Sequence, residues 1–342
     1  MIVDDSLTVR SVLSRTIESA GDLEVVSRVS SAELGLRELD QTMPDVVVLD
    51  LEMPGMGGFK ALPKFLAASP AVKVLVVSSL TEEGAEATVA ALSMGAADTM
   101  PKPQSRKFAE DFRVQLVEKI RALGGGQNSR AAGQAPPVSA PRIARPARRP
   151  RVIAIGASTG GIHALNQLLR ACPASVDVPI LVTQHLPGSF LPVFAKQVES
   201  ASGRKAIVVD NDTIVKQGMI HIAPGHGHMT LREFAGELRV RIIEGAMPSG
   251  CTPSVDPMFE SLATAVGGEA LGVVLSGMGK DGAVGAKALV DAGGTIFAQD
   301  QESSAVWGMP RAVAERGLAS AILPPGKLAL RMAALLEAGV WK

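Results

Sequence analysis

The sequence predicts two α/β units, each a parallel sheet flanked by helices, joined by a linker that does not fold. Three observations carry this prediction: apolar runs with little polar alternation, helical segments between those runs, and one stretch that has neither. Continuous apolar runs are typical of strands covered on both faces by helices, and their alternation with helices is typical of doubly wound sheets. The length of 342 residues also favours two domains over one.

The first unit is predicted to cover residues 1–122. Its clearest strands are Asp45–Asp50 and Val72–Ser78. The first strand is nearly missing, because only Met1–Val3 precede the first acidic residues.

A linker is predicted over residues 123–149. This stretch is rich in Gly, Pro, Ala and Arg and has no apolar periodicity, so it cannot bury enough surface to fold. Its arginines either contact an acidic surface or serve only solubility.

The second unit is predicted to cover residues 150–342 as a mostly parallel, doubly wound sheet. Its segments are strands at 152–155, 178–185, 272–276 and 295–298, helices at 261–266 and 280–292, and an antiparallel ribbon at 231–243.

The composition excludes several classes of protein. The 34 basic and 34 acidic residues cancel, which argues against nucleic acid or an acidic membrane surface as the main partner. No apolar run is long enough for a membrane span, and the N-terminus lacks the features of a signal peptide. Cys172 and Cys251 are far apart in sequence and are predicted to be inert, buried thiols of a reducing compartment. We therefore expect a cytoplasmic protein without direct membrane insertion.

Acidic residues follow the predicted strands of the first unit. Asp4, Asp5 and Asp50 come at strand ends, as do Ser78 and Lys102. Because these ends meet at one edge of a parallel sheet, the carboxylates together could hold a hard cation such as Mg²⁺. A lysine and a hydroxyl beside them fit the transfer of a phosphoryl group to one aspartate.

This unit resembles the response-regulator receiver domain, a (βα)5 flavodoxin-like fold. The resemblance lies in Val3-Asp-Asp-Ser6, Pro44–Gly55, Val77–Leu80 and Pro101-Lys-Pro103. It implies that Asp50 accepts the phosphoryl group and that Ser78 and Lys102 form the switch. It also implies that Asp5, Asp50 and the Glu52 carbonyl bind Mg²⁺, with Asp4 nearby.

The first unit departs from the receiver pattern at two further positions. Gly57-Gly58 stands where Asp-Gly is usual, and Thr99 lies where receivers commonly carry an aromatic switch residue.

In the second unit, Gly156-Ala-Ser-Thr-Gly-Gly161 follows an apolar strand and opens a helix. It matches the G-x-S-x-G nucleophile elbow, but the only histidines late enough in the chain for that order are His221 to His228. It could also bind a dinucleotide, although the spacing is not G-x-G-x-x-G and the next strand ends in Gln184-His185 instead of an acid.

A third interpretation pairs Ser158 with His185, which ends the neighbouring strand. Adjacent strand ends lie about 5 Å apart, close enough for a general base. Asp281 follows a third strand and could orient His185, or it could merely cap a helix. His226-Gly-His228 is expected to form a turn near the substrate, since no acidic or sulfur partner is spaced to complete a zinc site.

Five motifs in this unit resemble the chemotaxis protein-glutamate methylesterase family, CheB. They are Gly156–Gly161, Gln184–Phe190, Ala223–Met229, Pro253–Phe259 and Gly277–Gly282. The resemblance implies Ser158 as nucleophile, His185 as base and Asp281 as orienting acid. Thr159 and Met278 would support the oxyanion.

Receiver, linker and esterase in this order imply a phosphorylation-activated hydrolase that demethylates glutamate methyl esters and deamidates glutamines on chemoreceptors. A CheA-type histidine kinase would phosphorylate Asp50 and release a receiver that otherwise covers the catalytic edge. Mg²⁺ would serve the receiver, and the esterase reaction would need no cofactor. Three alternatives stay open: a non-catalytic binding module, a nucleotide-dependent oxidoreductase, and a CheB-like enzyme of a non-flagellar pathway.

Overall fold

The computed structural model describes residues 1–79, 81–102, 109–125 and 149–337. The chain divides into two compact units, Met1–Gly133 and Gln134–Lys342, and each is described by itself. The predicted linker lies almost entirely outside the described residues. Within the described ranges, no helix combines the length and the apolar character needed to cross a bilayer.

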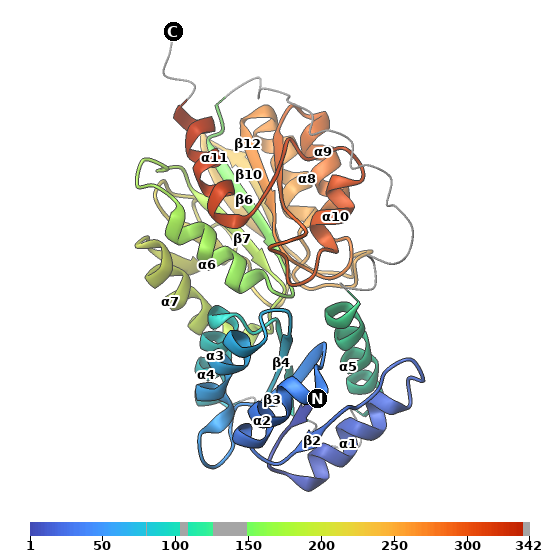
Figure 1. The fold of residues 1–342 in the computed structure, drawn as a ribbon. Helices are drawn as coiled ribbons and strands as arrows, with labels where there is room; N and C mark the ends of the chain where they lie inside the picture. Colours follow the sequence, from blue (N-terminus) through green and yellow to red (C-terminus); the bar gives the residue numbers. More distant parts are fainter. Residues whose placement is uncertain (80, 103–108, 126–148, 338–342) are drawn as a thin grey trace. The chain divides into compact units, whose positions relative to one another are not determined.

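The first unit is a five-stranded parallel sheet in the order β2-β1-β3-β4-β5. Figure 1 shows its strands β2, β3 and β4 among the helices of this unit. Its strands are β1 (Ile2–Val3), β2 (Arg28–Val29), β3 (Val46–Asp50), β4 (Lys73–Ser78) and β5 (Asp98–Pro101). Its helices are α1 (Leu7–Glu18), α2 (Ala32–Thr42), α3 (Gly57–Ala68), α4 (Glu82–Met94) and α5 (Ala109–Gly124).

Local signals explain where these helices begin and end. The hydroxyls of Ser6, Ser31 and Thr81 each accept a hydrogen bond from an amide in the first turn of α1, α2 and α4. Met43 and Gly95 end α2 and α4 in the left-handed conformation, with φ of 40° and 118°.

The second unit contains a seven-stranded parallel sheet in the order β14-β13-β12-β6-β7-β9-β8. Its strands are β6 (Val152–Ala157), β7 (Ile180–Gln184), β8 (Ala206–Val208), β9 (Ile220–Ile222), β12 (Ala270–Val274), β13 (Thr295–Gln299) and β14 (Ala321–Leu323). Its α-helices are α6 (Gly161–Ala171), α7 (Leu191–Ser202), α8 (Asp256–Ala265), α9 (Ala283–Asp291), α10 (Met309–Ala314) and α11 (Pro325–Glu337), with 3-10 turns η3 (Gly188–Phe190) and η4 (Gly267–Glu269).

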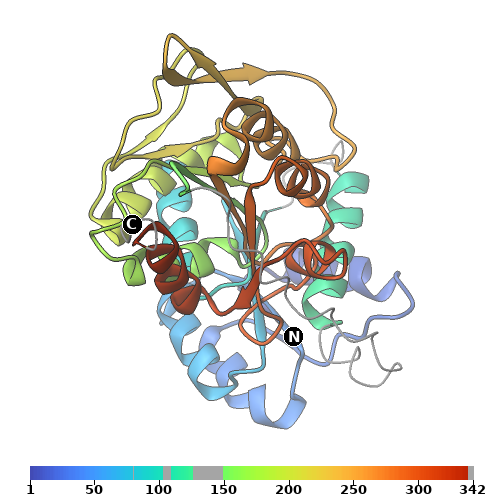
Figure 2. The ribbon, with the colours of Figure 1, turned by 90° about the horizontal axis from the view of Figure 1, so that it is seen from above.

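Helices cover both faces of this sheet. Helices α6, α7 and α11 lie on one side and α8, α9 and α10 on the other (Figure 1). An antiparallel ribbon of β10 (His228–Phe234) and β11 (Glu237–Ile243) extends at one edge of the unit (Figure 2). Because both faces are covered, β6, β7, β12 and β13 are buried along their whole length.

Strand β6 lies where the strand order of the sheet reverses. From β6 the chain builds β7, β8 and β9 on one side, and later adds β12, β13 and β14 on the other. In such sheets the loops at the carboxyl ends of the strands beside this point form the crevice that binds ligands.

The predicted fold class is confirmed in both units. The strands expected near β3, β4, β7, β12 and β13 lie within about two residues of their predicted bounds. Strands β2, β8, β9 and β14 went unpredicted because they have only two or three residues. Helix α8 begins at Asp256, earlier than expected, because Pro257 is tolerated in its first turn.

Candidate functional site

Ser158 and His185 follow neighbouring strands at the carboxyl edge of the second sheet. Ala157 pairs with Gln184, and the His185 amide donates to the Ala157 carbonyl over 3.0 Å. Ser158 follows Ala157 directly, so the side chains of Ser158 and His185 start from adjacent strand ends, as predicted.

The turn that carries Ser158 is held on both sides. Its amide donates to the Ser276 carbonyl over 3.0 Å, and its carbonyl accepts from Nε2 of Gln184 over 3.0 Å. Gly160 has a φ of +74°, and a Cβ there would lie 2.4 Å from Cβ of Ala305. This turn therefore requires glycine both for its backbone conformation and for space.

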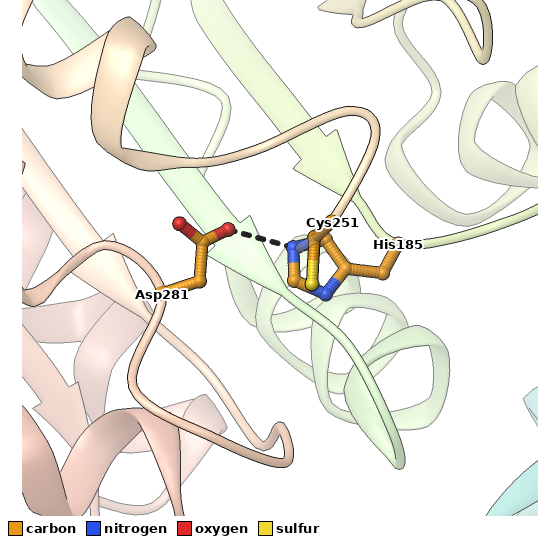
Figure 3. A group of neighbouring side chains, drawn as sticks. All are labelled: His185, Cys251 and Asp281. Atoms are coloured by element: carbon orange, nitrogen blue, oxygen red, sulfur yellow. Dashed lines mark hydrogen bonds and ion pairs between the residues drawn. The ribbon is translucent and has the colours of Figure 1, made fainter. Parts of the chain in front are cut away.

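His185 and Asp281 are hydrogen-bonded, with 2.8 Å between Nε2 and Oδ2 (Figure 3). Burial lowers the pKa of His185, but the bond to Asp281 and the neighbouring Cys251 outweigh it and raise that pKa to about 9. Burial raises the pKa of Asp281, but its hydrogen bonds, first of all that to His185, hold it near 2. The carboxylate thus stabilises a positively charged imidazole.

Asp281 is fixed by residues that sequence reasoning did not single out. Its Oδ1 accepts from the Ser254 hydroxyl over 2.6 Å, and its Oδ2 accepts from the Val255 amide over 2.7 Å. Both donors belong to the Pro253–Phe259 motif, to which no role was assigned.

Asp281 does not cap the following helix. The amides of Val284 and Gly285, in the first turn of α9, instead donate to Oδ1 of Asp256 over 3.0 and 2.8 Å. Asp281 is therefore not the cap of α9; its carboxylate instead accepts from the amides of Val255 and Asp256 at the start of α8 and bonds to His185.

His228 is a buried structural histidine. Its Nε2 bonds to the Gly245 carbonyl over 2.8 Å, and its Nδ1 accepts from the Ser254 amide over 2.9 Å. With both ring nitrogens engaged, it cannot serve Ser158 as the nucleophile-elbow interpretation would need. His226 is exposed.

The Ser158 hydroxyl has no hydrogen bond to His185 or to any other described residue. Such contacts are often open before substrate binds. Thr159, beside it, is buried, and its carbonyl accepts from the Ser276 hydroxyl over 2.7 Å.

The backbone amide of Met278 is the donor that was expected to stabilise an oxyanion. The Gly277 carbonyl accepts from the amides of Gly308 and Met309 over 3.0 and 2.8 Å. The Met278 amide points the opposite way in the same peptide plane and has no acceptor among the described residues. A Cβ on Gly277 would lie 2.9 Å from Cβ of Ser158, so this segment lies against the serine.

Cys251 differs from its sequence prediction. Both cysteines are half-buried, not buried, and Cys251 lies beside His185 (Figure 3). The cysteine is absent from the motifs that identified the site.

The acidic cluster of the first unit comes together as predicted from the strand ends. One carboxylate oxygen each of Asp4, Asp5 and Asp50 lies within 4.8 Å of the other two. Oδ2 of Asp4 is buried and has no hydrogen-bond partner among the described residues. Burial raises the pKa of Asp4, and it raises the pKa of Asp50 to about 6. Carboxylates with unfilled bonding capacity suit a hard divalent cation such as Mg²⁺.

Lys102 is paired with Asp50, whose Oδ2 accepts from Nζ over 2.8 Å. The Ser78 hydroxyl lies at the end of β4, 2.6 Å from the Thr88 hydroxyl of α4. The side chain of Glu52 accepts from the Ser79 hydroxyl over 2.6 Å, while its amide donates to Oδ1 of Asp50 over 2.9 Å.

The backbone of Asp50 leaves no room for a side chain at Gly58. A Cβ at Gly58 would lie 1.8 Å from the carbonyl oxygen of Asp50, so the backbone of the acceptor residue occupies that space. Gly57 has a φ of +69°, which also favours glycine there. Thr99 lies half-buried within β5.

Comparison with known proteins gives matches over both units. The CheB methylesterase family model matches residues 153–332, and the response regulator receiver domain model matches residues 1–110. Protein-glutamate methylesterase/protein-glutamine glutaminase 2 of Caulobacter vibrioides is 44% identical over 333 residues, covering 95% of this chain and 94% of the relative. The corresponding enzyme 1 of Paramagnetospirillum magneticum is 39% identical over 358 residues, covering 96% and 93%. The crystal structure of the CheB methylesterase catalytic domain of Thermotoga maritima is 32% identical with a TM-score of 0.53, covering 55% of this chain and all of that one.

Proposed function

The chain belongs to the CheB methylesterase family, and from that premise we propose that it hydrolyses glutamate methyl esters on chemoreceptors by a Ser158–His185–Asp281 mechanism controlled by phosphorylation. The observation that carries the mechanism is the hydrogen-bonded pair of His185 and Asp281 at the strand end next to Ser158.

In the first step the Ser158 oxygen attacks the ester carbonyl and its proton passes to His185. Nε2 of His185 donates to the ionised Asp281, so Nδ1 carries the lone pair and acts as the base. Asp281 stabilises the imidazolium that forms. The negative charge on the tetrahedral oxygen is stabilised by backbone amides of the turns at Thr159 and Met278.

Collapse of this intermediate releases methanol, which takes its proton from His185. Water then attacks the acyl-serine while His185 takes its proton; the bond to Ser158 breaks, His185 returns the proton to the serine oxygen, and the glutamate product leaves. A glutamine side chain follows the same path with ammonia in place of methanol, which accounts for a glutaminase activity. Neither reaction needs a cofactor.

In the receiver, Asp50 accepts the phosphoryl group. Mg²⁺ bound by Asp4, Asp5 and Asp50, with the Glu52 carbonyl, would supply positive charge next to the transferred phosphoryl oxygens. Lys102 adds a further positive charge, and Ser78 would leave Thr88 to bond to the phosphoryl group.

The partners follow from these two chemistries. A histidine kinase of the CheA type supplies the phosphoryl group, and the cytoplasmic helices of a chemoreceptor supply the ester. The enzyme therefore acts in the cytoplasm. We also propose domain limits of 1–122 and 150–342, with residues 123–149 as a linker.

Methanol release from methylated receptor membranes tests the whole proposal. The wild type is expected to release methanol faster when acetyl phosphate and Mg²⁺ are present. Ser158→Ala is expected to lose at least about 10³-fold in rate, since removal of any triad member leaves only residual catalysis. Asp50→Asn is expected to keep the basal rate and lose the stimulation. Equal rates for Ser158→Ala and the wild type, or full stimulation of Asp50→Asn, would contradict the assignment.

A further inference from the structure

Cys251 adds a third potential metal ligand to the His185–Asp281 pair. One ring nitrogen of His185, the Cys251 sulfur and one carboxylate oxygen of Asp281 all lie within 4.8 Å of one another. Figure 3 shows the three side chains converging from three separate segments of the second unit. Neither the triad mechanism nor the family motifs use the thiol.

The three donor atoms are of the kinds that Zn²⁺ binds. Sulfur, imidazole nitrogen and carboxylate oxygen are its protein ligands, and soft sulfur disfavours Mg²⁺. Around tetrahedral Zn²⁺, with bonds of about 2.0–2.3 Å, neighbouring donors lie roughly 3.3–3.8 Å apart. The 2.8 Å separation of His185 and Asp281 would have to widen by less than an ångström, and the sulfur lies within reach.

The surroundings favour a bound ion with one open position. Asp281 is held by the Ser254 hydroxyl and the Val255 amide, so its carboxylate is already oriented. Cys251 is half-buried and the His185 side chain is 14% exposed, so an ion can enter from solvent. Three protein ligands leave the fourth position of the metal to water.

We propose that His185, Cys251 and Asp281 bind Zn²⁺ or another thiophilic divalent cation, and that the bound ion switches off ester hydrolysis. Binding releases two protons to solvent, one from the thiol and one from Nε2 of the His185 imidazolium, while the second ring proton stays on Nδ1. The inhibition rests on the proposed function, because a metal on Nε2 leaves the ring proton on Nδ1, which then has no lone pair to accept the proton of Ser158. Binding itself does not depend on it.

Co²⁺ tests the site without reference to activity, because a thiolate ligand gives Co²⁺ an intense near-ultraviolet charge-transfer band. The full-length protein is titrated with Co²⁺ in excess Mg²⁺, which keeps the carboxylates of the receiver occupied. The band is expected in the wild type and in Cys172→Ser, and is expected to disappear in Cys251→Ser. Cys172 is the matched control because it is the other half-buried thiol of the same unit.

Thiol protection provides a second readout that does not depend on removing Cys251. Cys172→Ser retains Cys251 as its single thiol, since the chain has two cysteines. Zn²⁺ is expected to slow the reaction of that thiol with a disulfide reagent, because a metal-bound thiolate is not free to attack, and EDTA is expected to restore the rate.

The activity measurement completes the test. Zn²⁺ is expected to inhibit methanol release by the wild type and by Cys172→Ser, with recovery on addition of EDTA. Cys251→Ser, compared with its own metal-free rate, should need at least about tenfold more Zn²⁺ for half-inhibition, because loss of a direct ligand costs at least as much affinity as loss of an outer-shell partner. Equal Zn²⁺ sensitivity of Cys251→Ser and wild type, or a wild type without the cobalt band, would overturn the proposal. A cobalt band in a protein without esterase activity would instead overturn the proposed function and leave the metal site standing.

Discussion

Nδ1 of the buried His228 ring accepts a 2.9 Å hydrogen bond from the backbone amide of Ser254. Nε2 of the same ring bonds to the Gly245 carbonyl, so both ends of the loop 245–254 are tied to one imidazole. The Ser254 hydroxyl in turn donates a hydrogen bond to Oδ1 of Asp281, and Oδ2 of Asp281 is hydrogen-bonded to His185. His228 thus fixes the segment whose Ser254 hydroxyl holds Asp281, and we propose it as a positioning residue for the proposed triad.

His228→Leu is expected to destabilise the second unit by about 1–3 kcal/mol, because the amide of the buried Ser254 would lose its hydrogen-bond partner. It is also expected to lower kcat more than it raises KM. Urea unfolding followed by tryptophan fluorescence measures this unit alone, since the two tryptophans are Trp307 and Trp341. His226→Leu is the control, because His226 is exposed and should change neither quantity. Equal stability of the two variants would refute the structural role.

Ser254→Ala is expected to lower kcat by about tenfold, because Oδ1 of Asp281 loses its 2.6 Å charge-assisted hydrogen bond. Ser249→Ala serves as the comparison, because the Ser249 hydroxyl contacts Ser254 over 3.3 Å and not Asp281. Methanol release under saturating and limiting substrate separates kcat from KM. If Ser249→Ala loses as much activity as Ser254→Ala, the loss of activity comes from disturbance of the loop and not from loss of the Ser254–Asp281 hydrogen bond.

The pH dependence of kcat/KM depends on the raised pKa of His185, about 9. The imidazolium cannot accept the serine proton, so kcat/KM should fall as the pH drops below this pKa, and should level off above it. Asp281→Asn should move the midpoint to lower pH, because it removes the charge that favours the imidazolium, and should reduce the rate by on the order of 10³–10⁴-fold. Measurement of kcat/KM between about pH 6 and pH 10 locates the midpoint for the wild type and for Asp281→Asn. A wild-type midpoint at or below the ordinary histidine pKa of about 6.5 would be the contrary result.

Gly58→Ala is expected to abolish phosphorylation of Asp50, because the new Cβ would meet the Asp50 carbonyl oxygen at 1.8 Å and the backbone would have to move. Gly124→Ala is the control, since a Cβ there would make only ordinary contacts of 3.6 and 3.7 Å. Incorporation of phosphate from acetyl phosphate gives the readout. Normal labelling of Gly58→Ala would show that the loop tolerates the methyl group.

Asp4→Asn is expected to raise the Mg²⁺ concentration needed for half-maximal phosphorylation by about tenfold, because the buried Oδ2, which no described residue hydrogen-bonds, loses its charge. Asp22→Asn removes an acidic side chain that pairs with Arg121 at the surface and should have no such effect. The same labelling assay at varied Mg²⁺ distinguishes the two variants. An unchanged Mg²⁺ requirement for Asp4→Asn would remove that residue from the metal site.

The fold class and the location of both candidate sites follow from the order of residues along the chain. Apolar runs such as Val46–Asp50 predict strands because helices cover both faces, and parallel strands bring their carboxyl ends to one edge. The acids after β1 and β3, and the residues after β6, β7 and β12, were therefore expected to meet. Motif order predicted the roles of Ser158, His185 and Asp281, which remain predictions.

Which atoms of these residues meet depends on contacts between distant segments of the chain. The local sequence around Asp281 is compatible both with capping a helix and with orienting a histidine. In the structure, Asp256 of α8 caps α9 instead. The bond of Asp281 to Nε2, the support from Ser254 and His228, and the position of Cys251 all involve residues from different segments of the chain. Local pattern does not encode such contacts, because they depend on how loops between covered strands pack against one another.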